Sequence, residues 1–211
     1  MSEEDCYLRR RLAMVESQLS ARGVHDDRLL QVMRKVPRHL FVPEELHNRA
    51  YEDSPLPLGP EQSISQPLVV AEMLELLKLK PTDRVLEIGT GSGYETALLS
   101  HLCEQVFTIE IDSALYEWSA LVFKRLGITN IQQKLGDGYL GWPEAAPFDA
   151  VILSAATPYM PELLLTQLQE GGRCVFPFGR EHQDLVLFQK SGDRVVRSEH
   201  GSVRFVMMKE S

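Results

Sequence analysis

The most constraining feature of this chain is a short apolar segment that ends in alternating glycines. Val85 to Gly93 reads Val-Leu-Glu-Ile-Gly-Thr-Gly-Ser-Gly, and a second apolar segment ends at Glu110. Glycines at this spacing turn a strand into a helix within a few residues and let the backbone approach a ligand closely. An acidic residue about 20 positions further on is placed to accept hydrogen bonds from ribose hydroxyls. The segment therefore predicts a pocket for an adenosine-bearing cofactor.

The glycine spacing and the charge before it favour one such cofactor. A dinucleotide fingerprint reads Gly-x-Gly-x-x-Gly and rests a pyrophosphate on a helix N-terminus. Here Gly89-x-Gly91-x-Gly93 is one residue shorter and follows Glu87. A carboxylate repels a pyrophosphate but attracts the ammonium and sulfonium groups of S-adenosylmethionine. We therefore predict S-adenosylmethionine rather than NAD or FAD; the alternative is a tight turn that binds nothing.

The composition is that of an acidic globular protein. Its 211 residues include 22 basic and 30 acidic side chains, and the resulting net charge of −8 argues against a large nucleic-acid-binding surface. Three widely spaced cysteines, Cys6, Cys103 and Cys174, predict neither a disulfide framework nor a metal site. An acidic N-terminus and the lack of a long apolar run argue against a signal peptide and a membrane span. We expect a cytoplasmic protein, without a metal, that binds neither nucleic acid nor membrane.

The order of predicted elements is that of an α/β fold. Apolar periodicity predicts N-terminal helices, and a proline-rich loop follows them. Strands joined by helices then indicate a doubly wound, mostly parallel sheet, and two final strands without a helix between them indicate an antiparallel C-terminal hairpin. The predicted helices are 7–21, 26–35, 67–79, 94–102, 113–126 and 161–168, and the predicted strands are 84–88, 105–110, 131–135, 148–153, 173–177, 184–189 and 202–208.

Ligands of such sheets bind at the carboxyl ends of the strands, which places several polar residues on one rim. Asp137 lies there between two glycines, so its carboxylate can reach an adenine amino group; a simple Asp-Gly turn is the alternative. The nearby turn at residues 154–157 is built of small residues. It lacks the Asn/Asp-Pro-Pro-aromatic cluster with which many enzymes hold a flipped-out base, so base methylation is disfavoured.

Longer motifs give the chain a family resemblance. They are Pro37-Arg38-x-x-Phe41-Val42-Pro43, Tyr51-x-Asp53-x-Pro55-Leu56-Pro57-Leu58-Gly59, Gln62-Ser63-Ile64-Ser65-Gln66-Pro67, the glycine segment through Tyr94, Gly136-Asp137-Gly138, Phe148-Asp149-Ala150, Gln167-Leu168-x-x-Gly171-Gly172 and Val203-Arg204-Phe205-Val206. In this order the chain resembles the protein-L-isoaspartate O-methyltransferases over nearly its whole length. The resemblance implies a Rossmann-like class I methyltransferase in a single domain, 1–211. Residues 1–66 would hold the N-terminal helices and substrate loop, and residues 67–211 would form the cofactor-binding core.

The implied reaction transfers the methyl group of S-adenosylmethionine to the α-carboxylate of an L-isoaspartyl residue in a damaged protein. The resulting ester closes to a succinimide, whose hydrolysis partly restores aspartate, and the enzyme is expected to act as a monomer. Ser65 matches the family's active-site residue, although by position alone it also suits a helix N-cap. The matching cofactor residues are Glu87, Gly89, Thr90, Gly91, Ser92, Gly93, Glu110, Ile111, Asp137 and Gly138, and the substrate residues are Ser63, Ile64, Val203, Arg204, Phe205 and Val206.

Elementary chemistry agrees with this reaction. A carboxylate with a pKa near 4 is already nucleophilic at neutral pH, so no general base is required and Ser65 suits an orienting hydrogen-bond donor. Two positions depart from the family pattern: Glu61 replaces a usual glycine, and the chain has Met207-Met208 where Pro-Leu is common. A negative side chain at position 61 leaves open a second hypothesis, a related enzyme acting on another peptide carboxylate. A third hypothesis is a cofactor-binding or interaction protein without catalytic activity.

Overall fold

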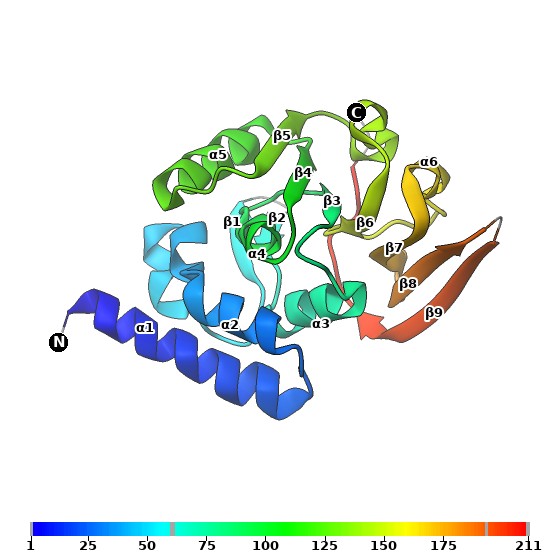
Figure 1. Ribbon diagram of the computed structural model, residues 1–211. Helices are drawn as coiled ribbons and strands as arrows, with labels where there is room; N and C mark the ends of the chain where they lie inside the picture. The colour runs from blue at the N-terminus through cyan, green and yellow to red at the C-terminus, as the bar shows by residue number, and fades with distance from the viewer. Residues whose placement is uncertain (1, 60–61, 193, 210–211) are drawn as a thin grey trace.

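A mixed sheet forms the centre of the molecule (Figure 1). The structure is a computed structural model that describes residues 2–59, 62–192 and 194–209. Within these ranges seven strands are ordered β5-β4-β3-β6-β7-β8-β9, of which β5 to β7 run parallel while β8 and β9 are antiparallel to their neighbours. This confirms the predicted fold class. The strands are β3 (Arg84–Ile88), β4 (Gln105–Glu110), β5 (Ile131–Leu135), β6 (Phe148–Leu153), β7 (Leu168–Gly179), β8 (Gln183–Ser191) and β9 (Arg194–Val203).

Each inner strand sends alternate side chains into one of two apolar cores. In β3, Val85 packs into a core with the N-terminal helices, whereas Leu86 and Ile88 pack into the opposite core beneath α6. Both faces of the parallel sheet are thus covered, as a doubly wound fold requires. The helices are α1 (Glu3–Met14), α2 (Asp27–Lys35), α3 (Pro67–Leu77), α4 (Tyr94–Leu102), α5 (Ser113–Leu126) and α6 (Glu162–Thr166). No helix of the described ranges is long and apolar enough to span a membrane.

The N-terminal part differs from the prediction in two places. Helix α1 begins at Glu3 rather than residue 7, because Ser2 and Asp5 form a capping box through reciprocal backbone hydrogen bonds of 3.1 and 2.9 Å. The proline-rich loop contains a small hairpin of β1 (Leu56–Gly59) and β2 (Gln62–Ile64). This hairpin carries the Ser63-to-Ser65 segment to the rim of the main sheet.

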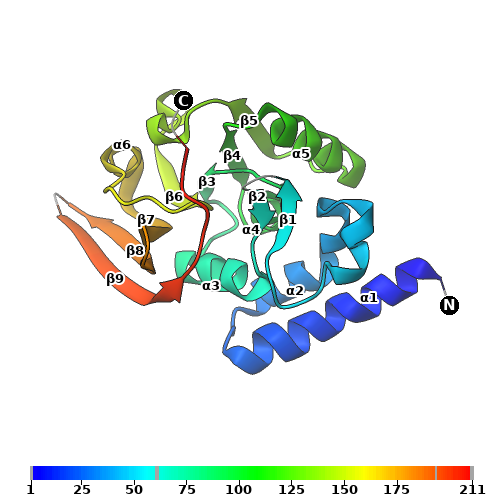
Figure 2. The same cartoon turned by 180° about the vertical axis from the view of Figure 1, so that it is seen from behind.

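The C-terminal part corrects the predicted boundaries of the last strand. A strand was expected at residues 202–208, but β9 ends at Val203, and Arg204, Phe205 and Val206 follow it outside any strand. Most of β9 is exposed and polar, so it gives no alternating apolar signal. The segment after β9 crosses the molecule (Figure 2) and is held by backbone hydrogen bonds of 2.8 Å on both sides of Ala156.

The strand order also identifies where a ligand can enter. From β3 the chain proceeds outward through β4 to β5, and it then returns to β6 on the other side of β3. A crevice opens at the carboxyl ends of two strands where the winding reverses in this way, which here are β3 and β6. Gly93, at φ +84°, turns the chain from the β3 loop into α4, and a Cβ there would lie 2.7 Å from the ring of Phe123. Only glycine fits this turn.

Candidate active site

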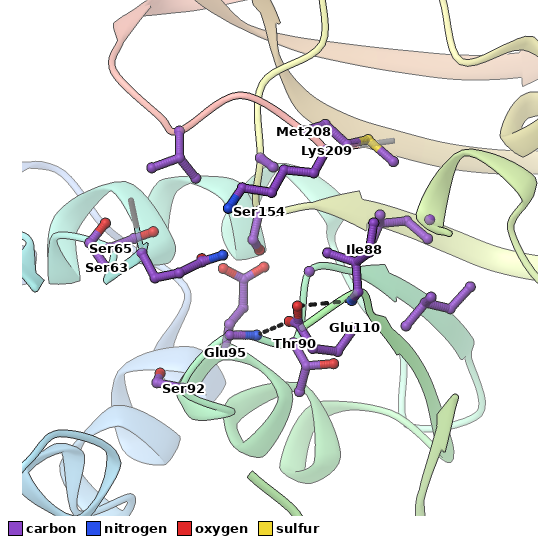
Figure 3. A pocket seen from close by; sticks show the side chains of 18 of the residues that line it. Ser63, Ser65, Ile88, Thr90, Ser92, Glu95, Glu110, Ser154, Met208 and Lys209 are labelled. Carbon is purple, nitrogen blue, oxygen red and sulfur yellow. Dashed lines mark hydrogen bonds between the residues drawn. The ribbon is translucent and has the colours of Figure 1, made fainter. Parts of the chain in front are cut away.

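A cleft lies at the predicted switch point, above the carboxyl ends of β3, β4 and β6. Its empty volume is about 850 Å³, which includes space open to solvent. The walls come from the β2 segment, the glycine loop, the rim of β4 and β6, and the segment after β9 (Figure 3). The backbone of the glycine loop is tied to the sheet, since the Gly89 amide donates to the Ile109 carbonyl at 2.8 Å.

Glu110 is fixed at the floor of this cleft by backbone amides. Its Oε2 accepts from Gly91 N at 2.7 Å, and its Oε1 accepts from Ile111 N and Asp112 N at 2.9 Å. A carboxylate has about four acceptor positions, so acceptor capacity remains on Oε2 after these three bonds. The arrangement joins the end of β4 to the glycine loop. It also presents an oriented anion to the cleft, as hydrogen bonding of ribose hydroxyls requires.

Gly138, which follows β5, lets the side chains of Ile88 and Met208 pack closely against the backbone. A Cβ at this position would lie 2.3 Å from Ile88 Cγ2 and 2.9 Å from Met208 Cε, so no larger residue fits without movement. Ile88 and Met208 both line the cleft. Asp137, next to it, caps a short 3₁₀ turn by accepting from Tyr139 N at 2.9 Å.

Glu87 lies behind the cleft rather than in its wall. The side chain is fully buried, and its Oε2 accepts hydrogen bonds from the hydroxyls of Thr96 and Thr108, both at 2.6 Å. Burial raises the pKa of the Glu87 carboxyl well above its usual value, and the neighbouring carboxyl of Glu95 raises it further, while the two threonines act in the opposite direction. Glu87 thus joins β3, β4 and α4 beneath the glycine loop.

The acidic side chain that does face the cleft is Glu95, in the first turn of α4. It is only 7% exposed, and its carboxyl end points toward Ser154 (Figure 3). Burial raises the pKa of Glu95 to about 7. Neither Glu95 Oε1 nor Ser154 Oγ has a hydrogen-bond partner within residues 2–59, 62–192 and 194–209. Lys209 lines the same cleft from the C-terminal segment.

Ser65 stands at the mouth of the cleft, on the segment between β2 and α3. The N-cap of α3 is Gln66, whose side chain does not cap the helix, so the capping interpretation of Ser65 is wrong. Instead the Ser65 carbonyl accepts from Arg38 Nη2 at 2.8 Å, and Gln66 Nε2 donates to Asp53 Oδ1 at 2.8 Å. Backbone contacts therefore position Ser65, whose side chain lines the cleft.

A second depression continues from the cleft along the segment after β9. Its lining includes Arg22, Glu72 and residues 202–206. It shares Ser63, Ser65, Ser154 and Val206 with the first cleft. The two spaces thus meet at these four residues, and a group in one can reach a group in the other.

The structure brings most of the predicted site residues together. Those that line the cleft are Gly89, Thr90, Gly91, Ser92, Glu110, Ile111, Gly138, Ser63, Ile64, Ser65 and Val206, and those that line the adjoining groove are Ser63, Ser65, Val203, Arg204, Phe205 and Val206. Among the described residues, Glu87, Gly93 and Asp137 support the walls without lining either space. Glu61 lies outside the described residues.

Among the site residues that the sequence did not predict, Glu95 and Arg38 matter most for the geometry. Glu95 follows Gly93 by two positions, and the left-handed turn at Gly93 directs it into the cleft. The signal available was a carboxylate in the first helical turn after the glycine loop. Arg38 belongs to the Pro37-to-Pro43 motif. An arginine between two prolines in an otherwise apolar segment could have suggested a buried, hydrogen-bonded role.

The cleft fits the predicted cofactor. A fixed carboxylate at the floor suits a ribose, and the orphaned Glu95 oxygen suits a cation. Together with the strand order and the crevice between β3 and β6, these features define a class I methyltransferase.

Comparisons with known proteins identify the family. The family model described as protein-L-isoaspartate(D-aspartate) O-methyltransferase matches residues 9–211. The chain belongs to this family. It is 50% identical over 208 residues to protein-L-isoaspartate O-methyltransferase 2 of Shewanella sediminis, covering 98% of this chain and 85% of the relative. It is also 50% identical over 194 residues to protein-L-isoaspartate O-methyltransferase 1 of Syntrophobacter fumaroxidans, covering 92% and 91%.

Solved structures agree over most of the chain. One protein-L-isoaspartate O-methyltransferase superimposes with a TM-score of 0.84 at 31% identity, covering 93% of this chain, which spans 65% of that protein. A Plasmodium falciparum structure that carries the same family name superimposes with a TM-score of 0.83 at 25% identity, covering 95% and 99%. That protein was solved in complex with S-adenosyl-L-homocysteine. The resemblance predicted from the sequence motifs is confirmed.

Proposed function

We propose that this protein transfers the methyl group of S-adenosylmethionine to the α-carboxylate of L-isoaspartyl residues in damaged proteins and peptides. The observation that carries the proposal is the junction of two spaces at Ser63, Ser65, Ser154 and Val206. A methyl donor in the cleft and a carboxylate in the groove would meet there. The family name supports the isoaspartyl acceptor, and the related structure with S-adenosyl-L-homocysteine supports the donor.

The chemistry at this junction requires alignment rather than proton transfer. The bound cofactor supplies an electrophilic methyl group on a sulfonium. One oxygen of the ionised acceptor carboxylate forms the new C–O bond while the C–S bond breaks, and the electron pair goes to sulfur. No proton moves, so the site needs no general base. The tasks left to the chain are to hold both groups in line and to exclude water from the carboxylate.

We assign the site residues to these tasks as follows. Glu110 would hold the ribose, and the glycine loop would receive the rest of the cofactor. The Ser65 hydroxyl would donate a hydrogen bond that orients the acceptor carboxylate. The backbone of residues 203–206 would hold the substrate main chain, a contact that accepts many sequences. Glu87, Gly93 and Asp137 would contribute by shaping the walls behind these residues.

The proposal extends to the organisation and setting of the protein. Residues 1–66 would form the part that presents the substrate loop, and residues 67–211 would form the cofactor core. Ser63 and Ser65 come from the first part, while Gly89 and Glu110 come from the second. We propose that the protein acts as a monomer in the cytoplasm without nucleic acid or membrane. Its net charge of −8 supports the exclusion of nucleic acid.

The test is incubation with labelled S-adenosylmethionine and an isoaspartyl peptide. The expected product is a base-labile methyl ester, and the same peptide with normal aspartate is the matched control. Labelling of neither peptide would contradict the proposal. Labelling of a different peptide carboxylate, with none on isoaspartate, would support the second hypothesis instead.

A further inference from the structure

We propose that Glu95 holds the positively charged end of the methyl donor and thereby makes the cleft prefer S-adenosylmethionine over S-adenosylhomocysteine, whose sulfur is uncharged. This inference rests on the proposed function and adds a residue that selects the donor over the spent product. Glu95 does not belong to the predicted cofactor set.

The position of Glu95 follows from where the methyl group has to be. A methyl donor in the cleft can reach an acceptor in the groove only at the residues that line both spaces. Ser154 is one of these residues, and the Glu95 carboxyl end points toward it (Figure 3). Glu95 therefore lies at the reacting end of the cleft. Glu110, which has its own set of amide donors, lies at the end of the neighbouring strand β4.

One oxygen of the Glu95 carboxyl has no hydrogen-bond partner in the described part of the chain. This oxygen is Oε1, and the side chain that carries it is more than nine-tenths buried. A buried carboxylate without a counter-charge costs free energy. We therefore expect this carboxylate to bind a cationic group of a ligand. Desolvation also strengthens the attraction between this carboxylate and a sulfonium, relative to the same pair in water.

The charged groups around Glu95 determine how it responds. Glu87 of β3 lies behind it, Glu110 of β4 lines the same cleft, and Lys209 reaches the cleft from the C-terminal segment. Burial places the pKa of Glu95 at about 7, so a large fraction of the apo protein carries the proton at neutral pH. An arriving cation lowers this pKa and drives the proton off. Binding of S-adenosylmethionine is thus linked to proton release. Binding of S-adenosylhomocysteine, whose sulfur is uncharged, should release a smaller fraction of a proton.

Isothermal titration calorimetry of the whole protein at pH 7, in two buffers of different ionisation enthalpy, tests this linkage. We expect S-adenosylmethionine to release about half a proton from a group with a pKa of about 7, and S-adenosylhomocysteine to release less. In Glu95→Gln, which keeps the side-chain shape, the difference in proton release between the two ligands should vanish.

In the same variant, the ratio of S-adenosylmethionine affinity to S-adenosylhomocysteine affinity should fall about tenfold, which corresponds to about 1.4 kcal/mol. Glu117→Gln, an exposed change on α5, is the matched control for lost charge.

The outcomes separate this inference from the proposed function. If both ligands bind wild type with equal proton release and Glu95→Gln keeps the affinity ratio, the inference is wrong while the methyltransferase proposal stands. If Glu95→Gln keeps the affinity ratio but raises KM for an isoaspartyl peptide, the Glu95 carboxyl contacts the acceptor instead. That result would also overturn the inference. If wild type binds neither ligand, both proposals fail. The proton count of wild type requires no variant, so it remains a test even if the substitution impairs folding.

Discussion

Arg38 donates from Nη2 to the carbonyl oxygen of Ser65 at 2.8 Å, and so connects the N-terminal motif to the mouth of the cleft. The side chain of Arg38 is fully buried, donates from Nε to the Ala50 carbonyl at 2.7 Å, and stacks on the ring of Tyr94 with its guanidinium carbon 4.8 Å from the ring centroid. The planar guanidinium group of arginine can make these contacts simultaneously, whereas the ammonium group of lysine cannot. Arg38 therefore acts as a positioning residue for Ser65.

Arg38→Lys should lower both stability and turnover. The substitution keeps the charge but leaves a buried carbonyl without its donor, so we expect a loss of about 2 kcal/mol in the free energy of unfolding. Turnover with an isoaspartyl peptide should fall more than cofactor affinity, because the Ser65 backbone moves. Urea unfolding and methylation kinetics measure the two effects. Arg34→Lys, at an exposed ion pair with Glu16, is the control and should change neither.

Ser65→Ala should separate catalysis from folding. Loss of a hydrogen bond to a carboxylate is expected to lower kcat about 10- to 100-fold, with little change in the dissociation constant of S-adenosylmethionine. Because Ser65 does not occupy the N-cap position of α3, the unfolding free energy should change by less than the ~1 kcal/mol typical of a lost cap. Unchanged turnover in single-turnover assays would leave Ser65 without the orienting role.

The inner strands could be predicted from the sequence because they are buried on both faces. The predicted bounds of β3 and β4 match the structure, since each is an apolar run that ends in a glycine or an acidic residue at the rim. The antiparallel pairing of the last strand was predicted, but its bounds were not. β9 is polar and exposed, and its pairing with β8 depends on backbone hydrogen bonds that leave no pattern in side chains. The apolar residues after Val203 suggested a strand, but they pack at the cleft and groove instead.

The site was partly predictable for a similar reason. The spacing of Gly89, Gly91 and Glu110 determines contacts between neighbouring strands, so the sequence shows it directly. The direction in which a side chain points after a turn cannot be predicted from residue spacing. Glu87 and Glu95 are both acidic and flank the same glycines, yet the strand buries the first behind two threonines and the helix turns the second into the cleft. Only the structure separates their roles.

Glu95 should make the stability of the apo protein depend on pH. Its folded pKa of about 7 lies above the ordinary value of 4.5, so the folded state favours the protonated form. The resulting stability is fully present below pH 4.5 and is lost as the pH rises through 7. The loss should be on the order of 3 kcal/mol relative to Glu95→Gln, which does not titrate. Urea unfolding of both proteins at several pH values measures the difference; a constant difference across this range would contradict the prediction.

Gly138→Ala should disturb the cleft by moving Ile88. The new Cβ would lie 2.3 Å from Ile88 Cγ2, and relieving this overlap should cost about 1–3 kcal/mol of unfolding free energy and weaken S-adenosylmethionine binding. Gly136→Ala, two positions away on the same loop, meets no protein atom within 4 Å and should change stability by less than about 0.5 kcal/mol.

Ile88→Ala removes the clashing atom, so it should cost less unfolding free energy in the Gly138→Ala background than in wild type. A double-mutant cycle by urea unfolding checks this coupling. Additive costs would show that the glycine is required for a reason other than contact with Ile88.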